Sequence, residues 1–92
     1  MGYRYVVLGA GRQGVAAAYD LLRHGQAQSL VIADRDAELA RRAADRVNGL
    51  LQSSVVESTA VDVTAQKALV PMLRGVDAVV SAVPYRFNLG VA

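Results

Sequence analysis

Three glycines behind a short apolar run constrain the fold of this chain more than any other feature. The stretch VVLGAGRQG, residues 6–14, places Gly9, Gly11 and Gly14 directly after β-branched and apolar residues. Glycine is costly in regular secondary structure and is used where the backbone must turn tightly or approach another group closely. The spacing G-x-G-x-x-G at this position predicts a strand, a tight turn and the start of a helix.

The rest of the chain alternates between two hydrophobic periods. Apolar runs predict strands at 3–8, 30–33, late in 55–63, and 76–83. Helical spacing of apolar residues predicts helices at 11–24, from an N-cap at Asp36 to Asn48-Gly49, at 64–73, and from residue 86 onward. The predicted order is βαβαβαβ.

This alternation is typical of an α/β protein with a parallel sheet and right-handed crossovers. We expect a Rossmann-type, doubly wound sheet with the strand order 3-2-1-4 and helices on both faces. The pattern RFNLGVA stops inside a predicted helix, so the chain is interpreted as the N-terminal portion of a longer fold.

Composition narrows the function classes. The chain has 92 residues, 53% of them hydrophobic, no cysteine and a net charge of +2, and no apolar run is long enough to span a membrane. The basic residues are scattered among acids and do not form a stripe. We therefore expect a cytoplasmic domain with no metal site, no membrane contact and no nucleic-acid partner.

The glycine motif and an acidic residue together predict a dinucleotide site. Gly9 permits the turn, Gly11 lets the backbone approach a pyrophosphate, and Gly14 allows close packing of the helix. Asp34 lies twenty positions after Gly14, at the end of the second predicted strand, where the dinucleotide fingerprint places a partner for the adenosine ribose. The alternative is a glycine-rich turn that binds no ligand.

Asp34 also bears on the choice of cofactor. A carboxylate accepts hydrogen bonds from a free ribose but repels a 2′-phosphate, so NAD is favoured over NADP. Arg35 and Arg12 leave NADP possible, since arginine binds phosphate well, although both are equally compatible with plain surface positions. His24, at a predicted helix C-terminus, is interpreted as a surface residue.

The ends of the later strands complete the predicted site. Asp62, in VDVT, either approaches the adenine or caps the helix starting near Thr64. Residues 81–84, SAVP, end the fourth strand across the topological switch point, where ligands bind in open α/β sheets. Tyr85 follows and either faces a substrate or packs against the next helix.

The segments YVVLGAGRQG, IADRD, VDVT and DAVVSAVPYRFNLGVA together resemble the N-terminal cofactor domain of the saccharopine dehydrogenase family, especially its lysine 6-dehydrogenase-like members. The resemblance covers nearly all of residues 1–92, and it implies one dinucleotide-binding domain without the catalytic domain. It implies an NAD(P)-dependent oxidoreductase of lysine metabolism that acts on the C–N bond of an amino acid. Carried over by motif, the resemblance implies that the pyrophosphate contacts Gly9, Gly11, Arg12, Gln13 and Gly14. It implies that the ribose contacts Asp34 and Arg35, and that the adenine contacts Asp62 and Val63. The nicotinamide end and the substrate would contact Ala82, Val83, Pro84 and Tyr85.

The resemblance implies that the family's substrate and proton-transfer residues lie mostly beyond residue 92, so the catalytic residues are unknown from this sequence. Two alternatives stay open: a regulatory NAD-binding module of the potassium-channel type, and an enzyme of the ornithine cyclodeaminase type. We also expect a homo-oligomer, formed through an exposed edge or face of the sheet.

Overall fold

The structure is a computed structural model that describes residues 2–62, 71 and 73–82. Its elements are β1 (Tyr3–Leu8), α1 (Arg12–His24), β2 (Ala27–Asp34), α2 (Ala37–Leu51), β3 (Val56–Ala60) and β4 (Ala78–Ser81). The strands form one parallel sheet in the order β3-β2-β1-β4. The predicted order 3-2-1-4 is confirmed.

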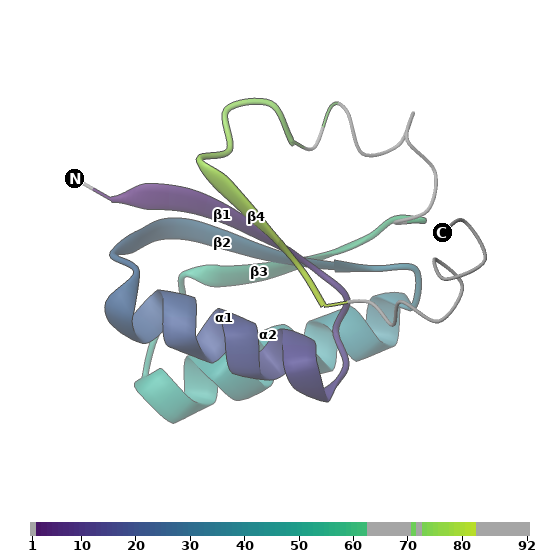
Figure 1. The fold of residues 1–92 in the computed structure, drawn as a ribbon. Helices are drawn as coiled ribbons and strands as arrows, with labels where there is room; N and C mark the ends of the chain where they lie inside the picture. Colours follow the sequence, from purple (N-terminus) through teal and green to yellow (C-terminus); the bar gives the residue numbers. More distant parts are fainter. Residues whose placement is uncertain (1, 63–70, 72, 83–92) are drawn as a thin grey trace.

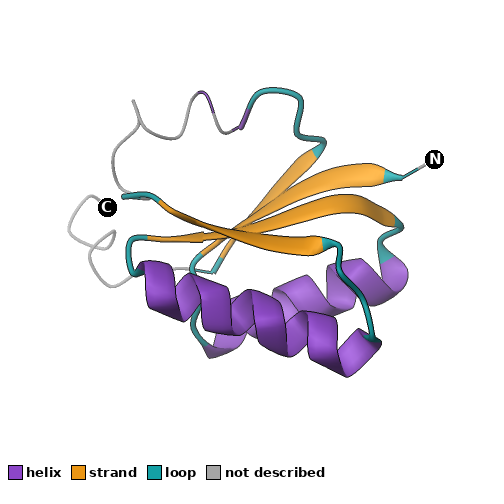
Figure 2. Cartoon of the chain, turned by 180° about the vertical axis from the view of Figure 1, so that it is seen from behind, coloured by secondary structure: helices purple, strands orange, loops and turns teal. Residues whose placement is uncertain are grey.

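Helices α1 and α2 both cover the same face of the sheet (Figure 1), as the view from behind also shows (Figure 2). The core lies between them and the strands. Its sheet side is formed by fully buried Val7, Leu30 and Ile32, and its helix side contains mostly small residues: Ala18 from α1, and Ala40, Ala43, Ala44 and Val47 from α2. Because alanine side chains are short, the helices can pack close to the strands.

Both helix starts and the end of α1 follow the sequence prediction closely. Asp36 caps α2 by accepting a hydrogen bond from the Leu39 N–H at 3.1 Å. Gly25 follows α1, and its N–H donates to the Leu21 carbonyl at 2.8 Å. A hydrogen bond from the Tyr5 hydroxyl to the Gly25 carbonyl at 2.6 Å ties this end of α1 to β1.

The end of α2 differs from the prediction. Asn48-Gly49 was expected to close the helix, but α2 continues to Leu51, and Gln52 takes the left-handed conformation with φ 50°. The Gln52 N–H donates to the Asn48 carbonyl and ends the helix there. The Asn48 side chain instead donates to the Val56 carbonyl at 2.9 Å and accepts from the Val56 N–H at 3.1 Å. Asn48 therefore connects the last turns of α2 to the start of β3.

The strand bounds also shift. β2 begins at Ala27, earlier than the predicted Leu30, because the polar segment before Leu30 pairs with β1. β3 ends at Ala60, so Asp62 lies two residues beyond the strand rather than at its last position. β4 is shorter than the predicted 76–83.

Other predictions lie outside the described residues. They are most of the helix at 64–73, the helix from residue 86, and the positions Val63, Val83, Pro84 and Tyr85. The expectation of helices on both faces is not tested, since the crossover between β3 and β4 includes residues 63–70.

Exposed ion pairs line the outer surface of α2. Glu38 accepts hydrogen bonds from Arg41 and Arg42, and Arg41 also pairs with Asp45 at 2.9 Å. The hydrogen bond from Arg41 lowers the pKa of the Glu38 carboxyl. Exposed pairs of this kind contribute little to stability. Neither α1 nor α2 is long and apolar enough to cross a membrane.

Candidate functional site

The predicted site residues that the structure describes gather at the carboxyl edge of the sheet. In parallel strands all carboxyl ends meet at one edge, and here Leu8 lies beside Ala33 and Ser81 at the ends of their strands. At this edge or directly beyond it lie Gly9, Gly11, Arg12, Gln13, Gly14, Asp34, Arg35, Asp62 and Ala82. Residues from four separate strand ends are thereby brought together.

The glycine loop is a tight turn between β1 and α1. Gly9 has φ 106°, a conformation that non-glycine residues rarely adopt. Its N–H donates to the Ala33 carbonyl at 2.7 Å, which extends the pairing of β1 with β2 by one step. A Cβ atom on Gly14 would lie 1.9 Å from the Gly9 carbonyl oxygen. The geometry agrees with the predicted reasons for glycine at both positions.

Gly11 has the opposite surroundings. A Cβ atom there would meet no atom of the described residues within 4 Å, so the space in front of it is open with respect to them. Gly11 is also the N-cap of α1, and no side chain from the described part of the chain caps this end of the helix. The first amides of a helix have no intrahelical partner and carry its positive dipole end, so this end of α1 is suited to bind an anion.

Asp34 makes contacts that the sequence reasoning did not anticipate. Its Oδ2 accepts from the Ala10 N–H at 2.9 Å, and its Oδ1 accepts from the Asp36 N–H at 2.9 Å. The carboxylate thus connects the glycine loop with the start of α2. No sequence signal pointed to Ala10, because its contribution is a backbone group.

The two candidate arginines beside the loop are exposed. Neither the Arg12 nor the Arg35 side chain has a hydrogen-bond or ion-pair partner within residues 2–62, 71 and 73–82. Both guanidinium groups are therefore available to an anionic ligand. His24 is exposed in the last turn of α1, as predicted for a surface residue.

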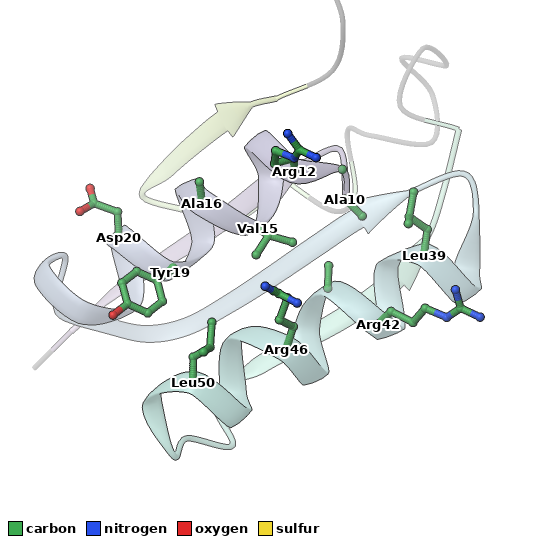
Figure 3. A pocket seen from close by; sticks show the side chains of 12 residues that line it. Ala10, Arg12, Val15, Ala16, Tyr19, Asp20, Leu39, Arg42, Arg46 and Leu50 are labelled. Atoms are coloured by element: carbon green, nitrogen blue, oxygen red, sulfur yellow. The ribbon is translucent and has the colours of Figure 1, made fainter.

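A groove lies between α1 and α2 and reaches the glycine loop (Figure 3). It has a volume of about 920 Å³, and Leu39, Arg46 and Leu50 of α2 point across it toward α1. Only Ala10, Gly11 and Arg12 are shared with the loop. The groove therefore begins at the glycine loop and continues along α1 and α2.

Comparison with protein families places the chain in a known family. A family model described as the saccharopine dehydrogenase NADP binding domain matches residues 5–92.

Several solved structures share this fold, among them two dehydrogenases. Quinate dehydrogenase from Corynebacterium glutamicum in complex with NAD has a TM-score of 0.72 and 33% identity, over 91% of this chain and 28% of that chain. Apo histidine-tagged saccharopine dehydrogenase (L-Glu forming) from Saccharomyces cerevisiae has a TM-score of 0.69 and 27% identity, over 98% of this chain and 18% of that chain. The chain therefore spans less than a third of either enzyme.

Proposed function

Because the chain belongs to the saccharopine dehydrogenase NADP binding domain family, we propose that it holds a nicotinamide dinucleotide at the carboxyl edge of its sheet. The observation that carries the proposal is the open space at Gly11, in front of the uncapped end of α1. A pyrophosphate in this space accepts hydrogen bonds from the first helix amides and interacts with the positive end of the dipole.

The described residues receive their roles from their places along this edge, and Val63, Val83, Pro84 and Tyr85, which lie outside the described residues, receive theirs from the family resemblance. Gly9, Gly11, Arg12, Gln13 and Gly14 surround the pyrophosphate, Asp34 and Arg35 the adenosine ribose, and Asp62 and Val63 the adenine. Ala82, Val83 and Pro84 line the nicotinamide side, and Tyr85 faces the substrate. The bound cofactor supplies hydride transfer, and the chain's own contribution is to bind and orient it.

We further propose that the whole protein is an NAD(P)-dependent oxidoreductase acting on the C–N bond of an amino acid. The resemblance of the fourth strand and its exit, VSAVPYRFN, to lysine 6-dehydrogenase-like proteins favours this substrate class. The similar quinate dehydrogenase bears the name of a different substrate, so the assay must include both classes. Reduction of NAD or NADP by the full-length protein with lysine or saccharopine, and not with quinate, is the expected result; reduction with quinate alone would contradict it.

One substitution separates cofactor binding from folding. Replacing Gly11 with alanine adds a methyl group to space that is empty in the protein but occupied by phosphate in the complex. We expect Gly11→Ala to weaken NAD binding at least about tenfold, measured by calorimetric titration, while stability falls by less than about 1 kcal/mol, the loss typical of an N-cap change.

Gly49→Ala is the matched control. Gly49 lies in α2, and a Cβ atom there also meets nothing within 4 Å. The same methyl group is then added away from the loop, and NAD affinity should stay unchanged. Equal affinities for Gly11→Ala and the unaltered chain would contradict the proposed pyrophosphate position.

The choice between NAD and NADP is proposed to depend on Asp34. Replacing Asp34 with serine removes a charged acceptor for the ribose hydroxyls, which should cost NAD about 1.5–3 kcal/mol. For NADP the same change removes a like charge beside the 2′-phosphate, so Arg35 can pair with that phosphate without repulsion from Asp34. We expect the unaltered chain to prefer NAD and Asp34→Ser to shift the affinity ratio toward NADP. An unchanged ratio would mean that Arg35 and Arg12 dominate the ribose site.

A further inference from the structure

The carboxylate of Asp34 holds two backbone segments in place without any ligand. It accepts the Ala10 N–H, twenty-four positions away in sequence, and the Asp36 N–H, each at 2.9 Å. Ala10 is only 2% exposed, so its N–H is not readily satisfied by water if the carboxylate is removed. Hydrogen bonds to a charged acceptor are the stronger kind.

The position of this contact explains its effect on the loop. The pairing of β1 with β2 ends where the Gly9 N–H donates to the Ala33 carbonyl. The next donor along the loop is Ala10, but the Asp34 carbonyl already accepts the Val61 N–H on the other side of β2. The Asp34 side chain therefore supplies the acceptor for the Ala10 N–H and ties the turn to the end of β2.

We propose that Asp34 is a positioning residue for the glycine loop, in addition to its proposed contact with ribose. The carboxylate keeps the turn in the shape that presents the first amides of α1 to a pyrophosphate. The inference rests on the proposed function for its consequence in ligand binding, but the bracing of the loop is a property of the protein alone. A carboxylate has about four acceptor positions, so two amide bonds leave capacity for ribose hydroxyls.

The two roles of Asp34 predict different behaviour toward a ligand without ribose hydroxyls. A residue that acts only on the ribose has no effect on 2′,3′-dideoxy-ADP, which keeps the pyrophosphate but lacks both hydroxyls. A residue that positions the loop affects the binding of this ligand as well as of ADP. Both probes should therefore be titrated.

The variants are Asp34→Ala, which removes both acceptors, and Asp34→Asn, which keeps one acceptor oxygen and a similar shape. Asp36→Asn is the matched control, because it removes the same charge two residues away and asparagine remains a good N-cap. Hydrogen exchange of the Ala10 amide, followed by NMR, reports on the brace without any ligand.

We expect the Ala10 amide to exchange about tenfold faster or more in Asp34→Ala, with a smaller increase in Asp34→Asn and no change in Asp36→Asn. Affinity for 2′,3′-dideoxy-ADP should fall about threefold or more in Asp34→Ala. If Asp34→Ala does not fold, Asp34→Asn decides through the same two measurements.

Unchanged Ala10 exchange in the Asp34 variants would overturn the brace. A loss of affinity confined to ADP would also overturn it and leave Asp34 as a ribose contact only. Failure of the unaltered chain to bind either nucleotide would instead contradict the proposed function, while the exchange measurement still decides the bracing role.

Discussion

Gly14 shows how closely α1 lies against the turn that precedes it. A Cβ atom at this position would be 1.9 Å from the Gly9 carbonyl oxygen and 2.8 Å from its carbon, and both are backbone atoms that a rotamer change does not move. Gly11, three residues earlier, has open space instead. The same motif thus contains one glycine that serves packing and one that leaves room for a ligand.

We expect Gly14→Ala to destabilise the chain by about 2–3 kcal/mol, because the added methyl group forces α1 away from the turn. Urea unfolding followed by circular dichroism measures the loss. Gly49→Ala serves as the control and should be neutral or more stable by up to about 1 kcal/mol, since alanine is the better helix former. Equal stabilities of the two variants would contradict this expectation and show that the backbone at Gly9 can shift to make room for the methyl group.

At the scale of secondary-structure elements, one side chain, that of Asn48, connects α2 to the start of β3. Asn48 satisfies both backbone groups of Val56, a residue that is 4% exposed at the start of β3. Asparagine is suited to this task because its amide both donates and accepts. The helix does not end at Asn48, and the residue instead sets the distance between the helix and the strand.

We expect Asn48→Ala to lower stability by about 1–3 kcal/mol, because it leaves the N–H and the carbonyl of Val56 without this partner. Asn48→Asp keeps an acceptor for the N–H but has no donor for the carbonyl. Unfolding measurements at neutral pH should therefore give Asn48→Asp an intermediate loss. A neutral effect of Asn48→Ala would indicate that water replaces the side chain.

At the scale of the whole molecule, β4 is an edge strand of the sheet within the described part of the chain. β4 pairs with β1 and with no other described strand, and Val79 is 42% exposed on it. Edge strands offer backbone groups for pairing with another chain. The exposed β-branched side chain adds apolar surface to the same place.

We predict that the 92-residue chain associates with itself through this edge at high concentration. Light scattering should show a mass that rises with concentration, and Val79→Lys should reduce the rise, since charged residues oppose edge pairing. Ser58→Lys, at an exposed position on the opposite edge strand β3, adds the same single charge and is the control for charge alone. A clean monomer at high concentration would contradict the prediction.

Much of the architecture was predictable because it depends on local pattern. The alternation of periods indicated the strands and helices that the structure describes, and the right-handed crossover rule then restricted the strand order. Strand ends were less predictable: the polar residues before Leu30 join β2 through pairing with β1, and Asp62 lies past the end of β3. Those bounds depend on the neighbouring strand rather than on the segment itself.

For the site, the glycine spacing and the distance from Gly14 to Asp34 were sufficient to place the loop and the acidic residue at one edge of the sheet. These features are local, or they follow from the parallel order of the strands. The sequence by itself therefore determined the fold class and placed the proposed site at the carboxyl edge of the sheet.

Only the tertiary structure decided which contacts the side chains make. Three features join residues that are apart in the sequence. They are the hydrogen bond from the Ala10 amide to Asp34, the two hydrogen bonds between Asn48 and Val56, and the groove between α1 and α2. Each depends on strand register and on how closely the helices pack, since a shift of one residue turns a strand side chain to the other face of the sheet. Nearly every residue has a backbone N–H, so the residue type does not reveal which amide makes a contact. For that reason the sequence contained no indication of the role of Ala10.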